Sequence, residues 1–166
     1  MAGSAQKKRL ALDTNVLLDL AEPKDFAHEF RETFQNKDYS LFIAPTVVAE
    51  LDALSLYGTA KQRRCGNLAL GKLLSWGIKA FDLSSIAEHL AEQFAQRLIA
   101  AGLIPAEEMN DALILGQTSS AEIPLLVTSD KHLLNIDETH LKAAFDDADL
   151  ALVTVADPKR LLRAIR

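Results

Sequence analysis

Short, continuous apolar runs recur along the chain, and segments with helical periodicity separate them. Continuous rather than alternating apolar residues are typical of strands that are buried on both faces of a parallel sheet. Parallel neighbours need a crossover connection, usually a helix, so this alternation predicts an α/β fold with helices on both faces of the sheet. The runs expected to form strands are residues 10–12, 41–44, 78–81, 125–128 and 150–155.

The helical segments have recognisable ends. Ser84 or Ser85 is expected to cap one helix, Gly102 to end it, and Pro105 to suit the first turn of the next. Asp157, followed by proline, is expected to begin a short C-terminal helix. The clearest helical segments are residues 26–35, 46–56, 64–75, 85–101 and 106–118, and the C-terminal helix reaches residue 165.

Length and composition favour one domain. With 166 residues, 49% of them hydrophobic, the chain can bury a core, and we expect a single domain over residues 1–166 with residues 1–8 as a flexible tail. No run approaches the roughly 18 apolar residues of a membrane span, and no signal-peptide core follows the basic N-terminus. The lone Cys65 cannot form an intramolecular disulfide. We therefore expect a cytoplasmic protein in which Cys65 is a buried or incidental thiol.

Four acidic residues stand where the apolar pattern would exclude a charge. Asp13 and Asp130 follow predicted strands, whereas Glu50 and Asp111 lie in predicted helices on the faces that carry apolar residues. Ligands of parallel α/β sheets bind beyond the carboxyl ends of the strands, so the four side chains are expected to converge there. Clustered carboxylates are costly to desolvate, and an oxygen-seeking divalent cation such as Mg²⁺ or Mn²⁺ would neutralise them.

Each acid also has a simpler explanation. An Asp after a strand is most often a turn former or a helix cap, and Glu50 or Asp111 could answer a nearby basic or amide side chain. Asp52 provides a contrast, because it lies on the other face of the same helix as Glu50 and is expected to be exposed. All four acids are nevertheless expected at the same edge of the sheet, and this coincidence favours one shared site over four separate explanations.

The chain resembles the PIN-domain nucleases in the order and spacing of four motifs, and the resemblance extends over residues 9–165. The motifs are residues 13–18 (Asp-Thr-Asn-Val-Leu-Leu), 47–51 (Val-Val-Ala-Glu-Leu), 110–114 (Asn-Asp-Ala-Leu-Ile) and 127–133 (Val-Thr-Ser-Asp-Lys-His-Leu). The resemblance implies a three-layer α/β/α sandwich around a mainly parallel sheet of five strands. It also implies a Mg²⁺- or Mn²⁺-dependent endoribonuclease that leaves a 5′-phosphate and a 3′-hydroxyl.

The resemblance also assigns roles to residues. The catalytic and metal-binding acids carried over are Asp13, Glu50, Asp111 and Asp130, and the supporting residues are Thr14, Asn15 and Thr128. Asp13 and Asp130, fixed at strand ends, are expected to be the most direct metal ligands. Asp111 would share the ion or ions, and Glu50 would bind through water or orient the attacking water.

Charge neither supports nor excludes an RNA substrate. The net charge of −5 argues against a nucleic-acid binder, but a metal held by four acids would reverse the local field that a phosphate meets. Basic residues are also grouped. The weak candidates for RNA contact are Lys61, Arg63, Arg64, Lys131 and Tyr57, whereas His132 is interpreted as a packing or surface residue.

Other classes fit less well or remain open. Haloacid-dehalogenase-like phosphatases carry Asp-x-Asp where this chain has Asp13-Thr14-Asn15, and receiver domains carry adjacent acids that are absent here. A catalytically silent PIN-like module that binds RNA or assembles with a partner is the non-enzyme alternative. Among nucleases, a VapC-like toxin paired with a small antitoxin competes with an RNA-processing role similar to PhoH-associated PIN domains. Toxin-type relatives suggest a homodimer, for which residues 85–101 could supply an apolar face.

Overall fold

The computed structural model describes residues 8–22 and 24–165, and its centre is a five-stranded parallel sheet in the order β3-β2-β1-β4-β5. The strands are β1 (Lys8–Leu12), β2 (Tyr39–Ile43), β3 (Ile78–Ala80), β4 (Leu125–Val127) and β5 (Thr154–Ala156). Leu10 pairs with Leu41 of β2, and Leu12 pairs with Val127 of β4. In the central strand the last three residues, Leu10 to Leu12, are buried, which explains why they are all apolar.

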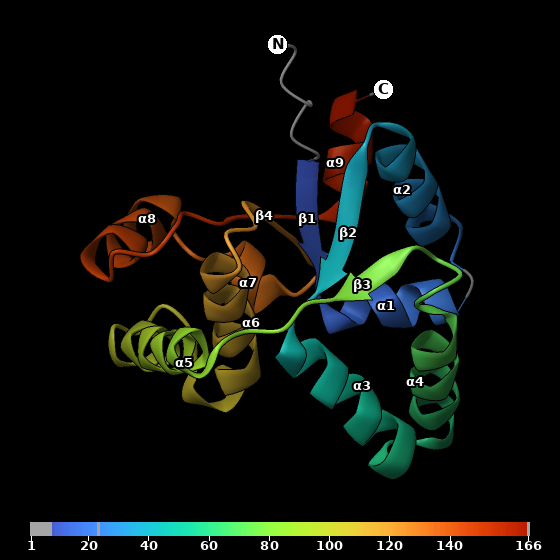
Figure 1. Ribbon diagram of the computed structural model, residues 1–166, viewed down its shortest axis with the longest axis horizontal. Coiled ribbons are helices and arrows are strands. Elements are labelled where there is room, and N and C mark those ends of the chain that lie inside the picture. Colours follow the sequence, from blue (N-terminus) through green and yellow to red (C-terminus); the bar gives the residue numbers. More distant parts are fainter. Residues whose placement is uncertain (1–7, 23, 166) are drawn as a thin grey trace.

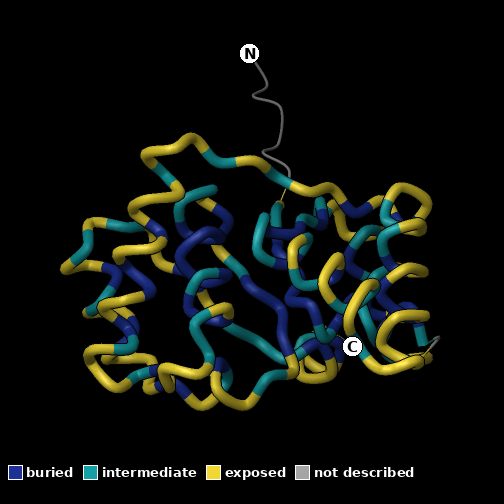
Figure 2. The backbone as a smooth tube through the Cα atoms, turned by 90° about the horizontal axis from the view of Figure 1, so that it is seen from below, coloured by how far each residue is buried: buried dark blue, intermediate teal, exposed yellow. Residues whose placement is uncertain are grey.

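Helices connect the strands and flank the sheet on both sides, as predicted (Figure 1). The first half of the chain contributes α1 (Thr14–Ala21), α2 (Asp25–Asn36), α3 (Pro45–Tyr57) and α4 (Ala60–Lys72). The second half contributes α5 (Ser85–Ala100), the 3-10 helix η1 (Ala106–Glu108), α6 (Met109–Ser120), α7 (Lys131–Leu134), α8 (Glu138–Asp147) and α9 (Pro158–Ile165). Figure 2 shows buried segments through the interior and exposed residues on the outer helices. The predicted α/β/α fold is confirmed.

Close helix packing fixes the position of α6, which carries Asp111. A methyl group added at Gly116 would lie 2.9 Å from the carbonyl oxygen of Ala91 in α5, so only glycine permits this approach. On the other side of the α5–α6 pair, Phe94 stacks on Phe145 of α8 with 4.6 Å between ring centroids. The apolar face of residues 85–101 is therefore largely used within the chain, although Ile86 and Leu90 remain exposed.

The strand order reverses beside β1. The chain passes from β1 to β2 and β3 in one direction, then returns to place β4 and β5 on the other side of β1. The carboxyl ends of β1 and β4 therefore open at the switch in strand order, the usual binding position in such sheets. The backbone N–H of Asp13 donates to the carbonyl of Val127 at 2.9 Å, which joins the two strand ends directly.

Several predicted boundaries need correction. The strand expected over residues 150–155 is wrong in its first part, because pairing with β4 begins at Thr154. The helix expected from residue 64 begins at Ala60, where Thr59 and Gln62 form a reciprocal capping box. Ser84, rather than Ser85, caps α5. Helices α1, α7 and α8 were not foreseen.

Other expectations are confirmed or fall outside the described residues. Cys65 is buried, and no helix within residues 8–22 and 24–165 is long and apolar enough to cross a membrane. Asp52 is exposed, as its place on α3 predicted. Residues 1–7 of the expected tail lie outside the described residues, and Lys8 is the first residue of β1.

Candidate active site

Asp13 is buried at the switch point, with 2% of its surface exposed. It is the N-cap of α1, and its Oδ1 accepts a 2.8 Å hydrogen bond from the backbone N–H of Thr14. Its Oδ2 accepts a 2.7 Å bond from the hydroxyl of Thr128 and a 3.1 Å bond from the amide of Asn15. Three donors therefore fix the carboxylate in one orientation.

Asn15 and Thr128 connect the two halves of the site. The Asn15 Nδ2 group also lies 3.2 Å from Thr128 Oγ1, and Asn15 Oδ1 accepts a bond from the backbone N–H of Ser129. Thr128 Oγ1 in turn accepts a 3.0 Å bond from the backbone N–H of Asp130. The supporting role expected of Asn15 and Thr128 thus has a geometric basis: both orient Asp13, and Thr128 also contacts the backbone of Asp130.

Glu50 reaches the same region from α3. The hydroxyl of Thr14 donates a 3.1 Å hydrogen bond to Glu50 Oε1. Val47 and Leu51 on the same face of α3 are fully buried, which directs Glu50 inward as the periodicity predicted. Consequently α1 contributes a hydrogen-bond donor to Glu50 and two of the three donors to Asp13.

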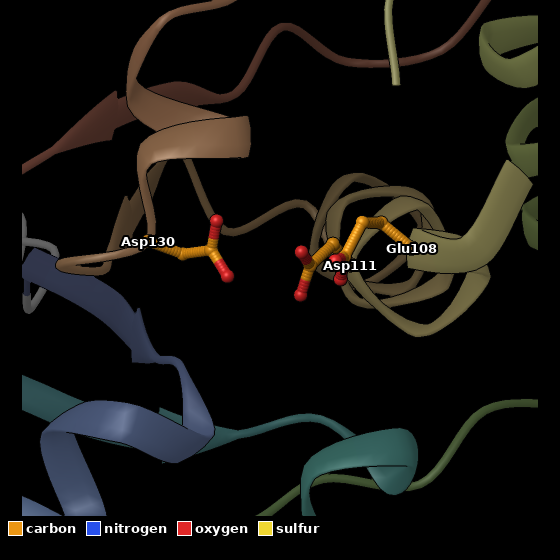
Figure 3. Close-up of side chains that lie close together, drawn as sticks. All are labelled: Glu108, Asp111 and Asp130. Atoms are coloured by element: carbon orange, nitrogen blue, oxygen red, sulfur yellow. The ribbon is translucent and has the colours of Figure 1, made fainter. Parts of the chain in front are cut away.

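Asp111 and Asp130 face one another from α6 and the start of α7 (Figure 3). Asp130 is the N-cap of α7, and its Oδ1 accepts a 2.7 Å bond from the backbone N–H of His132. Asp111 is 7% exposed. Its Oδ2 is fully buried and has no hydrogen-bond partner among the described residues.

Glu108 joins this side of the site and was missed by the sequence analysis. One oxygen from each of Glu108, Asp111 and Asp130 lies within 4.8 Å of the others. Glu108 stands three residues before Asp111, so the helical repeat places the two on one face. That spacing was the available signal, but Glu107 beside it made the choice ambiguous: Glu107 is exposed and Glu108 half-buried.

Burial and mutual repulsion raise the pKa values of the inner acids. Desolvation, followed by the charge of Asp13, raises the pKa of Glu50 to about 7. The same two causes, with contributions from Asp130 and Glu108, raise the pKa of Asp111 to about 8. Burial also raises the pKa of Asp13, in spite of its three hydrogen bonds. Without a cation the folded chain can reduce this repulsion only by keeping some of the carboxyl groups protonated, since among the described residues no Lys or Arg forms an ion pair with these acids.

The donor set fits a hard divalent cation. It consists of carboxylate oxygens, with hydroxyl and amide groups behind them, and this is the chemistry that Mg²⁺ and Mn²⁺ favour. The buried Asp111 Oδ2 is a carboxylate oxygen that has no hydrogen-bond partner among the described residues. Of the residues expected to bind metal, Asp111 and Asp130 lie in the compact carboxylate group, whereas Asp13 and Glu50 approach from the β1 side.

The residues proposed for RNA contact are spread over three helices, α3, α4 and α7. Lys61 lines a groove of about 370 Å³ together with Asn15, and it forms an ion pair with Glu22. Lys131 is exposed immediately after Asp130. The remaining candidates are exposed near the junction of α3 and α4. Tyr57 is 84% exposed, and Arg64 lies on the surface of α4. Arg63 donates a hydrogen bond to the carbonyl oxygen of Gly58.

Comparison with known proteins identifies the family. A family model described as the PIN domain matches residues 10–139. No curated protein matches the chain. The fold is similar to VapBC2 of Rickettsia felis bound to a promoter DNA fragment, with a TM-score of 0.60, 20% identity, and coverage of 89% of this chain and 98% of that chain. VapBC-1 of nontypeable Haemophilus influenzae is similar with a TM-score of 0.57 and 14% identity, covering 91% and 98%.

A third similar structure is FitAcB from Neisseria gonorrhoeae, with a TM-score of 0.50, 17% identity, and coverage of 87% and 96%. At these identities the three structures show likeness of fold. The family match spans the motifs of Asp13, Glu50, Asp111 and Asp130, and the parallel sheet places those motifs at one edge. The chain belongs to the PIN domain family.

Proposed function

We propose that the chain is a divalent-metal-dependent endoribonuclease that hydrolyses RNA phosphodiester bonds. The observation that carries the proposal is the convergence of acids at the β1–β4 switch point, where Asp111 Oδ2 is buried without a described partner. Burial of several carboxylates in one place is costly unless a cation compensates it. Membership of the PIN family supports the same chemistry.

The residues of the chain have separable tasks in this proposal. A bound divalent ion supplies charge stabilisation at the phosphate and activates water at neutral pH. Asp13, Asp111 and Asp130 would hold the ion or ions, with Asp13 kept rigid by Thr128 and Asn15. Glu50, with its pKa raised to about 7, is suited to accept a proton from the attacking water, and Thr14 fixes the orientation of its carboxylate.

The RNA backbone would approach over the groove that Asn15 shares with Lys61. Lys61 supplies positive charge in that groove, where it also pairs with Glu22, and Lys131 supplies it next to Asp130 on the α7 side. These contacts would attract phosphate without reading its sequence. A cation held by the acids would reverse the local field that a phosphate meets, so the net charge of −5 does not exclude an RNA substrate.

The direct test is cleavage of a panel of structured RNAs in Mg²⁺, Mn²⁺ or EDTA. Wild-type protein is compared with Asp13→Asn and Asp130→Asn, and Asp52→Asn is the control because Asp52 is exposed on the same helix as Glu50. Metal-dependent cleavage that both site variants lose and the control keeps supports the nuclease. Absence of cleavage, together with no metal binding by calorimetry, would establish the silent assembly module instead.

A toxin role with a small antitoxin partner is the biological setting that we favour. The similar structures are complexes named VapBC and FitAcB, and an antitoxin that inserts a basic side chain would find the acids of this site unpaired. Co-expression with the product of an adjacent small reading frame is expected to give a stable complex and to inhibit cleavage. A complex that cleaves RNA as fast as the free chain would contradict this role.

A further inference from the structure

Glu108, Asp111 and Asp130 form a compact group on the α6–α7 side of the site. An oxygen of each lies within 4.8 Å of the others, and Figure 3 shows the three side chains directed toward one another from η1, α6 and the start of α7. Asp13 differs from them, since its two oxygens already accept three hydrogen bonds. The group of three therefore has more free acceptor capacity than the strand-end acid expected to bind metal most directly.

The buried oxygen of Asp111 is an independent sign of a ligand. The residue is 93% buried, and its Oδ2 has no hydrogen-bond partner among residues 8–22 and 24–165. A buried carboxylate oxygen without a donor loses its hydration and gains nothing in return. Asp130 lies opposite Asp111 in Figure 3, and a cation held between the two carboxylates would compensate the cost of burying Asp111.

His132 contacts two members of the group in different ways. Its backbone N–H donates to Asp130 Oδ1 at 2.7 Å, while its ring Nε2 lies 3.5 Å from Glu108 Oε1. The ring is half-exposed, so it can turn without disturbing the core. One residue thus orients Asp130 through its backbone and holds Glu108 near the group through its side chain.

We propose that Glu108, Asp111 and Asp130 form a divalent-cation subsite in which Glu108 is a direct ligand and His132 a positioning residue for Glu108. The inference rests on the proposed nuclease function, because the subsite belongs to the same cleft. Glu108 supplies a carboxylate oxygen from the partly exposed rim, where a cation can enter without crossing the core. Asp13 and Glu50 then remain available on the β1 side for the attacking water or a further ion.

The test measures metal binding itself, by titration of the full chain with Mn²⁺ followed by electron paramagnetic resonance. Glu108→Gln is expected to weaken Mn²⁺ binding at least about tenfold, because loss of a direct ligand costs at least as much as loss of its supporting contacts. Glu107→Gln is the matched control, since it removes the same charge from the same turn at an exposed position. Its Mn²⁺ affinity should stay within about twofold of wild type. Glu108→Asp, which keeps the charge, should give an intermediate affinity.

His132 is tested by a pair of substitutions. His132→Gln retains a side-chain donor for Glu108, whereas His132→Leu removes it while keeping the backbone bond to Asp130. Mn²⁺ affinity should survive in the Gln variant and fall in the Leu variant. Equal Mn²⁺ affinity of the Gln and Leu variants would show that the His132 side chain does not position Glu108.

The result that overturns the subsite is distinct from failure of the nuclease. If Glu108→Gln and Glu107→Gln bind Mn²⁺ equally while Asp111→Asn abolishes binding, Glu108 is not a ligand and the metal-dependent function stands. If wild-type protein binds no Mn²⁺ at millimolar concentration, the proposed function itself fails. A rise in melting temperature on addition of Mn²⁺, lost in Glu108→Gln and kept in Glu107→Gln, supplies a second supporting readout.

Discussion

The hydroxyl of Thr128 donates a 2.7 Å hydrogen bond to Oδ2 of Asp13, across the junction of β4 with β1. The same hydroxyl oxygen accepts the backbone N–H of Asp130. Thr128→Val preserves shape and removes both of these bonds, together with the contact from Asn15 Nδ2. We expect RNA cleavage to fall by about 10–100-fold, because contacts that orient metal-binding groups typically have effects of this size.

The control for this substitution is Thr154→Val, which removes a hydroxyl from an exposed position on β5. Cleavage rates at saturating Mg²⁺ and melting temperatures are compared for both variants. Equal activity of the two variants would show that Thr128 does not orient the site.

The metal-free protein should become less stable as pH rises. The pKa values of Glu50 and Asp111, about 7 and about 8, exceed their ordinary values of 4.5 and 3.8, so the folded state binds more protons than the unfolded state between these limits. Their contribution to stability is complete below the ordinary values and is lost as pH rises through 7 to 8. The melting temperature in EDTA is therefore expected to fall between about pH 5 and pH 8.5.

Added Mn²⁺ should oppose this fall, with a larger rise in melting temperature at the alkaline end, because ligands must be deprotonated to bind. Asp111→Asn should flatten the pH dependence in EDTA and remove part of the Mn²⁺ effect. A melting temperature in EDTA that stays constant or rises with pH would contradict the raised pKa values.

Gly116 controls how closely α6 approaches α5. A methyl group there would lie 2.9 Å from the carbonyl oxygen of Ala91, so Gly116→Ala is expected to lower the free energy of unfolding by about 1–3 kcal/mol. Gly71→Ala, on α4, meets no atom within 4 Å and should be neutral or stabilise by up to about 1 kcal/mol. Urea denaturation of both variants measures the difference, and equal stabilities would show that the helix pair adjusts freely.

Lys61 is expected to contribute to RNA affinity rather than to chemistry. In an Asp13→Asn background that does not cleave, Lys61→Gln should weaken binding and reduce the slope of log affinity against log salt by about 1. Lys72→Gln, at the other end of α4, is the matched control. Fluorescence polarisation with a labelled RNA at several salt concentrations provides the data, and identical slopes for the two variants would exclude a phosphate contact by Lys61.

The sequence predicted those elements in which a local pattern of apolar residues indicates burial. The runs at β1, β2 and β4 contain buried apolar residues and could be recognised, and so could β3, although only Ile78 of its three residues is buried. Residues 150–153 are also largely apolar, but only the residues from Thr154 onward pair with β4. An apolar run therefore shows neither which of its residues are buried nor which form the ladder, since Leu152 is 48% exposed.

The missed helices have weaker local signals. Helix α1 begins within the motif at Asp13 and continues the apolar run of β1, so no change of pattern marks its start. Helix α8 is short and polar, and its Asp137 cap is visible only once its tertiary contacts are known. Glu108 could not be assigned to the site because two adjacent glutamates, Glu107 and Glu108, lie in η1. The sequence does not show which of the two η1 directs toward Asp111.

The groups that orient Asp13 are encoded at opposite ends of the chain, since Thr128 follows it by 115 residues. A nascent chain that has emerged from the ribosome only as far as α5 already contains Asp13 and Glu50, but it contains neither Asp111, Thr128 nor Asp130. The order of synthesis therefore delays completion of the site until β4 has been made and has paired with β1. An emerging chain that stops short of residue 130 can hold Asp13 and Glu50 in place, but it does not yet carry the complete set of carboxylates.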